Sequence, residues 1–245
     1  EIINSGKLKK MIAEDGISGV TSNHSIFEKA ISSRSDYDED IATLLQKKKS
    51  YDVIFFSLAV KDIKRAADLF SNVYKKSNGE DGFVSLEVPP YLARDTEGTM
   101  QEARRLYSAV GKQNCLIKIP GTKEGIPAIE QMLYEGININ ITLLFSVDRY
   151  VEVAQAYIRA IERRVVEDKP VGHVISVARV VISRIDVLTD QLLAQYIIPS
   201  GDKKNDEQLK QLSRRDGTAN AGLCNQKAQE ICSTAKGKKR AEKEA

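Results

Sequence analysis

A lysine lies inside an otherwise apolar segment of this chain, and this feature restricts the fold and the chemistry most strongly. Lys118 has an isoleucine on each side, in the segment 115–122 that a Pro-Gly pair brings to an end. Apolar runs of this length between turn residues are typical of buried strands in parallel sheets. Burial disfavours an ammonium ion and lowers its pKa, so that a neutral amine becomes available to attack a carbonyl carbon. The alternative is a lysine near a strand end whose ammonium group extends to water.

Strand-like and helix-like segments alternate five times along the chain. Apolar residues three to five positions apart indicate the helices, and short apolar runs between turn residues indicate the strands. Ser146 is a predicted N-cap, and Gly136 is a predicted helix stop. The expected strands are 17–23, 83–88, 115–122, 137–145 and 174–182, and the expected helices are 5–13, 25–31, 37–74 with room for one break, 97–110, 126–135, 148–166 and a last one that ends near 195. This alternation predicts an α/β fold built on a parallel sheet.

The overall composition restricts the class of protein further. The chain has 245 residues, of which 42% are hydrophobic, and this suffices for one α/β barrel domain. A net charge of +3 is too small to indicate a nucleic acid or an anionic membrane as partner. Three cysteines without a paired framework indicate a reducing compartment, and neither of the two histidines has a metal-ligand spacing. We find no apolar stretch long enough to span a bilayer and no signal peptide, so the sequence predicts neither a membrane protein nor a metal site.

Side-chain alternation places polar residues on one face of the expected sheet, because residues two apart in a strand share a face. The residues that share faces are Thr21 with Asn23, Ser85 with Glu87, Lys118 with Leu116, and Asn138 with Asn140 and Thr142. On the other face of the same region we expect Ile139, Ile141 and Leu143 to pack against the helices. In a barrel the polar face points inward, and its groups near the carboxyl ends of the strands form the active site.

Several segments of the chain resemble the conserved blocks of the transaldolase family. They are residues 19–30 (GVTSNHSIFEKA), 82–88 (GFVSLEV), 95–99 (DTEGT), 116–120 (LIKIP), 136–146 (GININITLLFS) and 182–186 (ISRID). The LIKIP segment is similar to the one that carries the Schiff-base lysine, and the ISRID segment is similar to the one with the phosphate-binding arginine. The resemblance covers residues 5–195 and indicates the longer bacterial and plant type.

This resemblance implies a TIM-type (β/α)8 barrel and a class I transaldolase that uses no metal and no organic cofactor. Such an enzyme transfers a dihydroxyacetone unit from fructose 6-phosphate or sedoheptulose 7-phosphate to an aldose phosphate in the pentose phosphate pathway. Lys118 would form the Schiff base, and Glu87 and Thr142 would move protons through a water. The implied substrate-binding residues are Asn23, Thr21, Asn140 and, for the phosphate, Arg184.

The same resemblance gives expectations about partners, location and domains. The expected partners are sugar phosphates and, in a homo-oligomer, further copies of the chain, with no nucleic acid and no membrane. The expected location is the cytoplasm, or a plastid if the source is a plant or an alga. We expect residues 1–200 to form a partial barrel and residues 201–245 to form a divergent charged tail, helical or disordered, that ends in the basic run 236–245.

The chain departs from the family pattern at five positions near the expected site. His24 stands where the family has a proline, and Arg179 stands where it has a serine. Pro89 and Tyr91 replace a small residue and an arginine, and Val181 replaces an aromatic residue. A second arginine can attract phosphate, but its volume can also obstruct the site.

The two ends of the chain also differ from the family pattern. The chain opens with Glu1 rather than Met, after the strand that carries an assisting aspartate in the family, and only five of the eight strands that close such a barrel are recognisable. We therefore expect a truncated or divergent copy. Three interpretations stay open: an active transaldolase completed by residues outside this sequence, a simple class I aldolase that releases dihydroxyacetone without an acceptor, and a catalytically impaired or inactive copy that binds a sugar phosphate or a partner.

Overall fold

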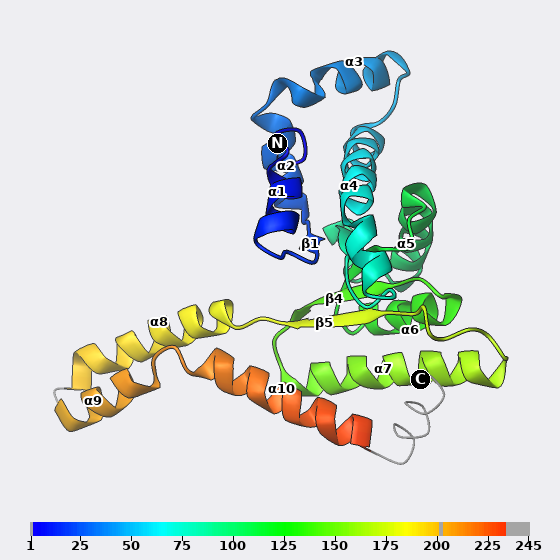
Figure 1. Cartoon of the computed structure of the whole chain (residues 1–245). Coiled ribbons are helices and arrows are strands. Elements are labelled where there is room, and N and C mark those ends of the chain that lie inside the picture. Colours follow the sequence, from blue (N-terminus) through cyan, green and yellow to red (C-terminus); the bar gives the residue numbers. More distant parts are fainter. Residues whose placement is uncertain (1, 201–202, 234–245) are drawn as a thin grey trace.

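A curled parallel sheet is the centre of the computed structural model, which describes residues 2–200 and 203–233 (Figure 1). The strand order is β1-β2-β3-β4-β5, so each strand pairs with the next one along the chain. The strands are β1 (Val20–Thr21), β2 (Val84–Glu87), β3 (Cys115–Pro120), β4 (Ile139–Leu144) and β5 (Ser176–Val180). Parallel strands in sequential order with helical connections are the architecture of a TIM-type barrel, of which this sheet forms a part. The predicted fold class is therefore confirmed.

Helices fill the connections between the strands and continue beyond β5. The helices are α1 (Lys7–Glu14), α2 (His24–Ser32), α3 (Asp38–Gln46), α4 (Tyr51–Lys76), α5 (Thr96–Val110), α6 (Gly125–Glu135), α7 (Val147–Val166), α8 (Ser183–Ser200), α9 (Lys203–Leu212) and α10 (Asp216–Ser233), with two 3-10 turns, η1 (Ser35–Tyr37) and η2 (Pro90–Leu92). The long helix predicted at 37–74, with one possible break, is broken between α3 and α4. There the side chain of Ser50 accepts a hydrogen bond from the Val53 amide and caps α4.

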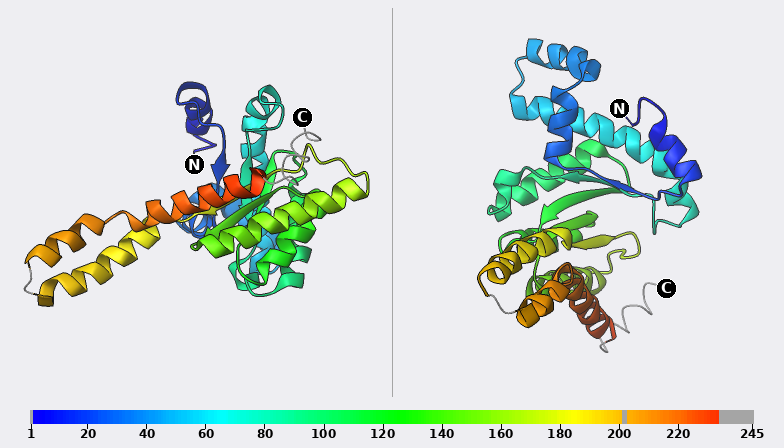
Figure 2. Two further views of the ribbon diagram at one scale, coloured as in Figure 1. Left: turned by 90° about the horizontal axis from the view of Figure 1, so that it is seen from below. Right: turned by 90° about the vertical axis from the view of Figure 1, so that its left-hand side faces the viewer.

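The hydrophobic core lies between the sheet and helices α4 to α7, which follow its outer side (Figure 2). Ile139 and Ile141 of β4 are buried in this core, as the side-chain alternation predicted. Lys118 and Asn140, which are register partners on β3 and β4, point to the opposite, inner face. The sequence thus folds with an apolar outer face and a polar inner face, and the inner face is where a site can form.

The predicted alternation fails at the carboxyl end of β4. Leu143 was expected to face the helices, but it is 41% exposed and has a φ of 60°, and Leu144 is buried in its place. The pairing of β4 with β5 shifts its register between Ile141 and Leu144, as at a β-bulge. One extra residue reverses the faces of all residues beyond it. The prediction for Leu143 is therefore wrong, and this residue lies on the same side as Thr142.

The predicted helix ends agree with the structure, whereas the first strand is shorter than predicted. The hydroxyl group of Ser146 accepts a hydrogen bond from the Arg149 amide at 3.2 Å and caps α7. Gly136 ends α6 in the left-handed conformation, with a φ of 89°. Of the expected strand 17–23, only the two residues of β1 pair with β2. The remainder of that segment is loop, and its last residue, Asn23, is the N-cap of α2.

Helices α8, α9 and α10 form an arm beyond the sheet, and α10 returns along α7 (Figure 1). The Gly217 amide donates to Asp186 Oδ1 at 2.8 Å, and Asn220 Nδ2 donates to the carbonyl oxygen of Phe145 at 3.1 Å. The division of the chain at residue 200 stays a prediction, and the basic run 236–245 lies outside the described residues. Within the described ranges, no helix is long and apolar enough to cross a membrane.

Candidate active site

Lys118 lies in the middle of the sheet, with its side chain on the inner face. Its register partners are Glu87 of β2 and Asn140 of β4, so these three side chains share one face. The Nζ of Lys118 donates to the carbonyl oxygen of Ser22 at 3.0 Å and lies 3.5 Å from Oε1 of Glu87. The residue is only 4% exposed. A lysine whose ammonium group extends to water is therefore excluded.

Two features of the site lower the pKa of Lys118. Burial is the larger cause, and the positive charge of Arg179 adds to it, while the carboxylate of Glu87 acts in the opposite direction. Val177 of β5 is the register partner of Asn140, and Arg179 follows Val177 by two residues. Residues two apart in a strand share a face, so Arg179 lies on the same face of the sheet as Asn140 and Lys118. A lysine with a lowered pKa holds more neutral amine near pH 7, and the neutral amine is the form that attacks a carbonyl carbon.

The carboxylate of Glu87 lies between two nitrogen groups. Its Oε1 faces Lys118, and its Oε2 lies 3.8 Å from Nδ1 of His24. Burial on its own raises the pKa of this carboxyl group, but the side chain of His24 and the charge of Lys118 outweigh burial, so the pKa is lowered. Glu87 is therefore held ionised next to the amine, in the state that can accept a proton.

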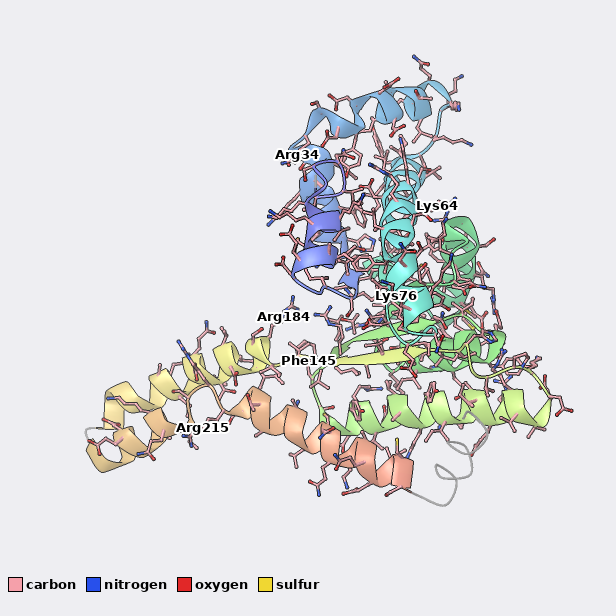
Figure 3. The ribbon with its side chains drawn as sticks, in the orientation of Figure 1. Arg34, Lys64, Lys76, Phe145, Arg184 and Arg215 are labelled. Atoms are coloured by element: carbon pink, nitrogen blue, oxygen red, sulfur yellow. The ribbon has the colours of Figure 1, made fainter. Side chains whose placement is uncertain are left out.

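A cavity of about 760 Å³ lies at the carboxyl ends of the strands and is bordered by Lys118. The polar residues that line it are Asn23, His24, Ser25, Glu87, Lys118, Thr142, Arg179, Ser183, Arg184 and Asp186. Arg184 is labelled in Figure 3, where the chain passes from β5 into α8 at this end of the sheet. In parallel α/β barrels the active site forms at the carboxyl ends of the strands, and the volume is in the range of small-molecule sites.

Three predicted residues besides Lys118 and Glu87 line this cavity. Asn23 caps α2 through Oδ1, which accepts a hydrogen bond from the Ile26 amide at 2.8 Å, so the NH2 group is what Asn23 offers to a ligand. Thr142 is largely buried next to the bulge of β4. Arg184 lies in the first turn of α8 and is exposed. The structure therefore brings five of the seven predicted site residues together around one cavity.

The other two predicted residues, Thr21 and Asn140, lie outside its lining. Thr21 is exposed and lines a second hollow of about 450 Å³, which α1, α2 and α4 border. Asn140 is buried beside Lys118, where its Nδ2 donates to Oγ of Ser85 at 2.9 Å. The Oδ1 of Asn140 is buried and has no hydrogen-bond partner among the described residues. Thr21 is thus separated from the predicted site, while Asn140 lies next to the lysine with an unused acceptor.

Two serines belong to the site although they were not predicted as site residues. The carbonyl oxygen of Ser22 accepts the hydrogen bond from Lys118, and the Ser22 hydroxyl donates to the carbonyl oxygen of Ser85 at 2.8 Å. The side-chain alternation that pairs Ser85 with Glu87 was the signal that could have identified Ser85. A backbone carbonyl leaves no side-chain signal, so nothing in the sequence indicated Ser22.

The positions at which the chain departs from the family pattern divide into two groups. His24, Arg179 and Val181 line the cavity. Pro89 and Tyr91 do not line it, and Tyr91 is exposed. In the part of the chain that the structure describes, no group of three His, Cys, Asp or Glu side chains could hold a metal ion. The absence of a metal and of a cofactor stays a prediction.

The fold and the site define an α/β-barrel protein with a buried lysine and an ionised carboxylate at the carboxyl ends of its strands. The model of the family described as Transaldolase/Fructose-6-phosphate aldolase matches residues 2–240. The chain therefore belongs to this transaldolase and aldolase family, as the resemblance of its motifs indicated.

Curated relatives agree with this membership. The chain is 44% identical to a protein named transaldolase from Trichodesmium erythraeum over 230 residues, which are 94% of this chain and 60% of that protein. It is 50% identical to transaldolase 2 of Nostoc punctiforme over 186 residues, which are 76% of this chain and 49% of that protein. A transaldolase of Renibacterium salmoninarum is 38% identical over 234 residues, with 96% and 60% covered. The chain thus spans about half to three fifths of the length of these relatives.

Proposed function

We propose that this chain carries the Schiff-base site of a cytoplasmic transaldolase of the pentose phosphate pathway. The observation that carries the proposal is the pair of the buried Lys118 and the partly buried Glu87, 3.5 Å apart beside a cavity. Family membership and the names of the relatives support the same reaction. The donors are ketose phosphates such as fructose 6-phosphate or sedoheptulose 7-phosphate, and the acceptors are aldose phosphates.

The first step of the proposed reaction forms an imine. The neutral amine of Lys118 attacks the carbonyl carbon of the ketose, and a C–N bond forms. The ionised Glu87 accepts the proton that the amine loses. It then returns this proton, through a water that the hydroxyl group of Thr142 orients, to the departing oxygen. A second proton, taken up from solvent through the same water, then lets that oxygen leave as a water molecule. The protonated imine that forms on Lys118 withdraws electrons from the neighbouring carbons.

The second step breaks the bond between C3 and C4. Its electron pair moves into the protonated imine and gives an enamine, while the C4 hydroxyl loses its proton and C4 departs as the aldehyde of a shorter aldose phosphate. The resemblance implies an aspartate outside this sequence as the base for that proton. The enamine carbon then attacks the aldehyde of the acceptor, whose oxygen takes up a proton. Addition of water finally releases the new ketose phosphate and the amine.

Polar groups around the cavity would hold the substrate. Arg184 would bind the phosphate, because a guanidinium group offers two parallel N–H donors to phosphate oxygens. The NH2 group of Asn23 would donate to a sugar hydroxyl. The Oδ1 of Asn140 would accept a hydrogen bond from the three-carbon unit on Lys118. Thr21 lines the second hollow and has no role in this proposal.

Two other functions make different use of the same residues. A simple aldolase is a candidate because the family description also names fructose-6-phosphate aldolase. It would release dihydroxyacetone to water without an acceptor. A protein that binds sugar phosphates without turnover is a candidate because Arg179 places a large side chain in the cavity.

Borohydride trapping of the purified chain with fructose 6-phosphate tests the proposal. We expect an adduct on Lys118, seen by intact mass and located by peptide mapping. A three-carbon adduct would show that the C3–C4 bond breaks without the aspartate that the resemblance implies. In a transaldolase, an aldose phosphate acceptor added before the borohydride should remove the three-carbon unit from Lys118. An aldolase would release this unit as dihydroxyacetone even when no acceptor is present. A six-carbon adduct alone would show an active amine without cleavage of the carbon–carbon bond.

Two lysine variants make the trapping experiment specific. Lys118→Met should form no adduct, and Lys123→Met, which changes an exposed lysine after the same strand, should form as much adduct as the parent chain. A folded parent chain that forms no adduct would contradict both the transaldolase and the aldolase function. The remaining candidate would be a protein that binds sugar phosphates without turnover.

A further inference from the structure

The imidazole ring of His24 is held in place by two aromatic rings of α4. It is the first residue of α2, directly after the N-cap Asn23. Its ring stacks on Phe55 of α4, with ring centres 5.4 Å apart and planes at 9°, and meets the edge of Phe56 at 5.7 Å and 75°. Two aromatic contacts from one helix fix both the position and the rotation of the imidazole ring.

The two ring nitrogens of His24 have different surroundings. Nδ1 lies 3.8 Å from Oε2 of Glu87. Nε2 is buried and has no hydrogen-bond partner among the described residues. A nitrogen lone pair that faced a carboxylate oxygen would be repelled, and a buried N–H without an acceptor is rare in proteins. Both arguments place the proton of the neutral imidazole on Nδ1, where it faces Glu87.

We propose that His24 is a positioning residue for Glu87: its Nδ1–H holds Oε2 and thereby directs Oε1 toward the amine of Lys118. The proposal rests on the proposed function of Glu87 as the group that accepts and returns the proton. The distance of 3.8 Å is long for a hydrogen bond, and such contacts in unliganded sites commonly shorten when substrate binds.

The charged groups near His24 determine in which direction its loss changes the pKa of Glu87. Glu87 of β2 faces the ring, Lys118 of β3 lies behind that carboxylate, and Arg105 of α5 lies 5.6 Å from the ring of Phe56. His24 lowers the pKa of Glu87, and loss of the imidazole therefore raises it. Glu87 must be ionised to accept a proton. With a raised pKa it becomes protonated, and therefore inactive, at a higher pH as the pH falls.

The sequence position offers a matched variant that removes the ring and keeps the helix. Proline is favoured at the first position of a helix, where its missing N–H would have no partner within the helix. His24 occupies this position, and the family pattern has a proline there. His24→Pro therefore deletes the imidazole without a break in α2. His24→Gln is the conservative partner, because its amide group can still donate to Glu87.

The first test is the pH profile of kcat and of adduct formation at Lys118. We expect the acid limb of His24→Pro to move up by about one pH unit, which corresponds to about a tenfold lower kcat on that limb, with a smaller change in KM. His24→Gln should recover most of this shift. An acid limb that stays in place in His24→Pro would overturn the proposal, and so would equal shifts in both variants, because the missing donor would then not be the cause.

A second test does not depend on turnover. The sequence has only two histidines, His24 and His173, so a long-range proton–nitrogen spectrum resolves both, and His173→Gln assigns them. We expect the Nδ1–H form for His24 in the parent chain and a loss of this preference in Glu87→Ala. An Nε2–H form in the parent chain would overturn the proposal. If the parent chain forms no adduct, the proposed function fails, while this spectrum still decides on the contact between His24 and Glu87.

Discussion

The amine of Lys118 and the carboxylate of Glu87 lie 3.5 Å apart because their residues are register partners on adjacent parallel strands. Each group affects the charge of the other. The charge of Lys118 helps to lower the pKa of Glu87, while Glu87 limits the extent to which burial lowers the pKa of Lys118. The site thus keeps a base ionised next to an amine that is easily deprotonated, which is the combination that imine formation needs.

Arg179→Ser tests the contribution of the second cation to the reactivity of Lys118. Without this charge the pKa of Lys118 should rise toward its ordinary value, so less neutral amine is present near pH 7. We expect adduct formation at pH 7 to slow by about three- to tenfold, and the increase of its rate with pH to occur at a higher pH. Arg215→Ser, on the exposed arm, is the control and should leave the rate unchanged. A faster rate in Arg179→Ser would mean that the volume of the arginine obstructs the cavity.

Two substitutions of Asn23 separate its role as a helix cap from its role toward a ligand. Asn23→Ala removes both the cap of α2 and the NH2 group, and should lower the free energy of unfolding by about 1 kcal/mol. Asn23→Ser keeps a capping oxygen and removes only the NH2 group, so stability should change little. Urea unfolding measures the first effect, and the KM for the ketose phosphate measures the second. A raised KM in Asn23→Ala alone would argue against contact between the NH2 group and substrate.

Glu87→Gln should change how the stability of the protein depends on pH. The pKa of Glu87 is lowered in the folded chain, so between the folded and unfolded pKa values the unfolded chain binds more protons, and stability rises with pH there. This contribution is complete above the unfolded value and is lost as the pH falls through the folded value. We expect the free energy of unfolding of Glu87→Gln to depend less steeply on pH between about pH 3 and pH 6. Urea unfolding across that range measures it, with Glu28→Gln as an exposed control; equal slopes for the parent and Glu87→Gln would contradict it.

Gly136→Ala should destabilise the chain at the end of α6. Gly136 has a φ of 89°, and a Cβ atom there would lie 3.1 Å from Nη1 of Arg164, a buried residue that donates to the carbonyl oxygen of Tyr134. We expect a loss of about 1 kcal/mol or more in the free energy of unfolding. Gly172→Ala is the matched control, because a Cβ atom at Gly172 meets no atom within 4 Å. Equal thermal midpoints for the two variants would refute the expectation.

Local signals explain the parts of the fold that the sequence predicted. The strand around Lys118, the cap at Ser146 and the stop at Gly136 depend on residues within a few positions of each other. Side-chain alternation also predicted that Ile139 and Ile141 are buried on the side of the sheet opposite to the polar residues. These features follow from backbone geometry, which needs no knowledge of the neighbouring strand.

Pairing between strands explains the parts that the sequence did not predict. The bulge that exposes Leu143 depends on how β4 pairs with β5, and the short β1 depends on how much of its segment can pair with β2. Thr21 was predicted with Asn23 because both were taken as parts of one strand. The chain enters α2 at Asn23, so the alternation ends and Thr21 lines a different hollow.

Local sequence patterns were enough to predict that a lysine lies in a buried strand and that a glutamate and several polar residues belong to the adjoining strands. The surroundings of that lysine come from the three-dimensional fold: the carbonyl oxygen of Ser22, which is 96 positions away, the ring of His24 behind Glu87, and the charge of Arg179. Loss of hydration and interaction between charges depend on distances in space. Those distances are set when strands that are remote in the sequence pair into one sheet, and no local pattern specifies them.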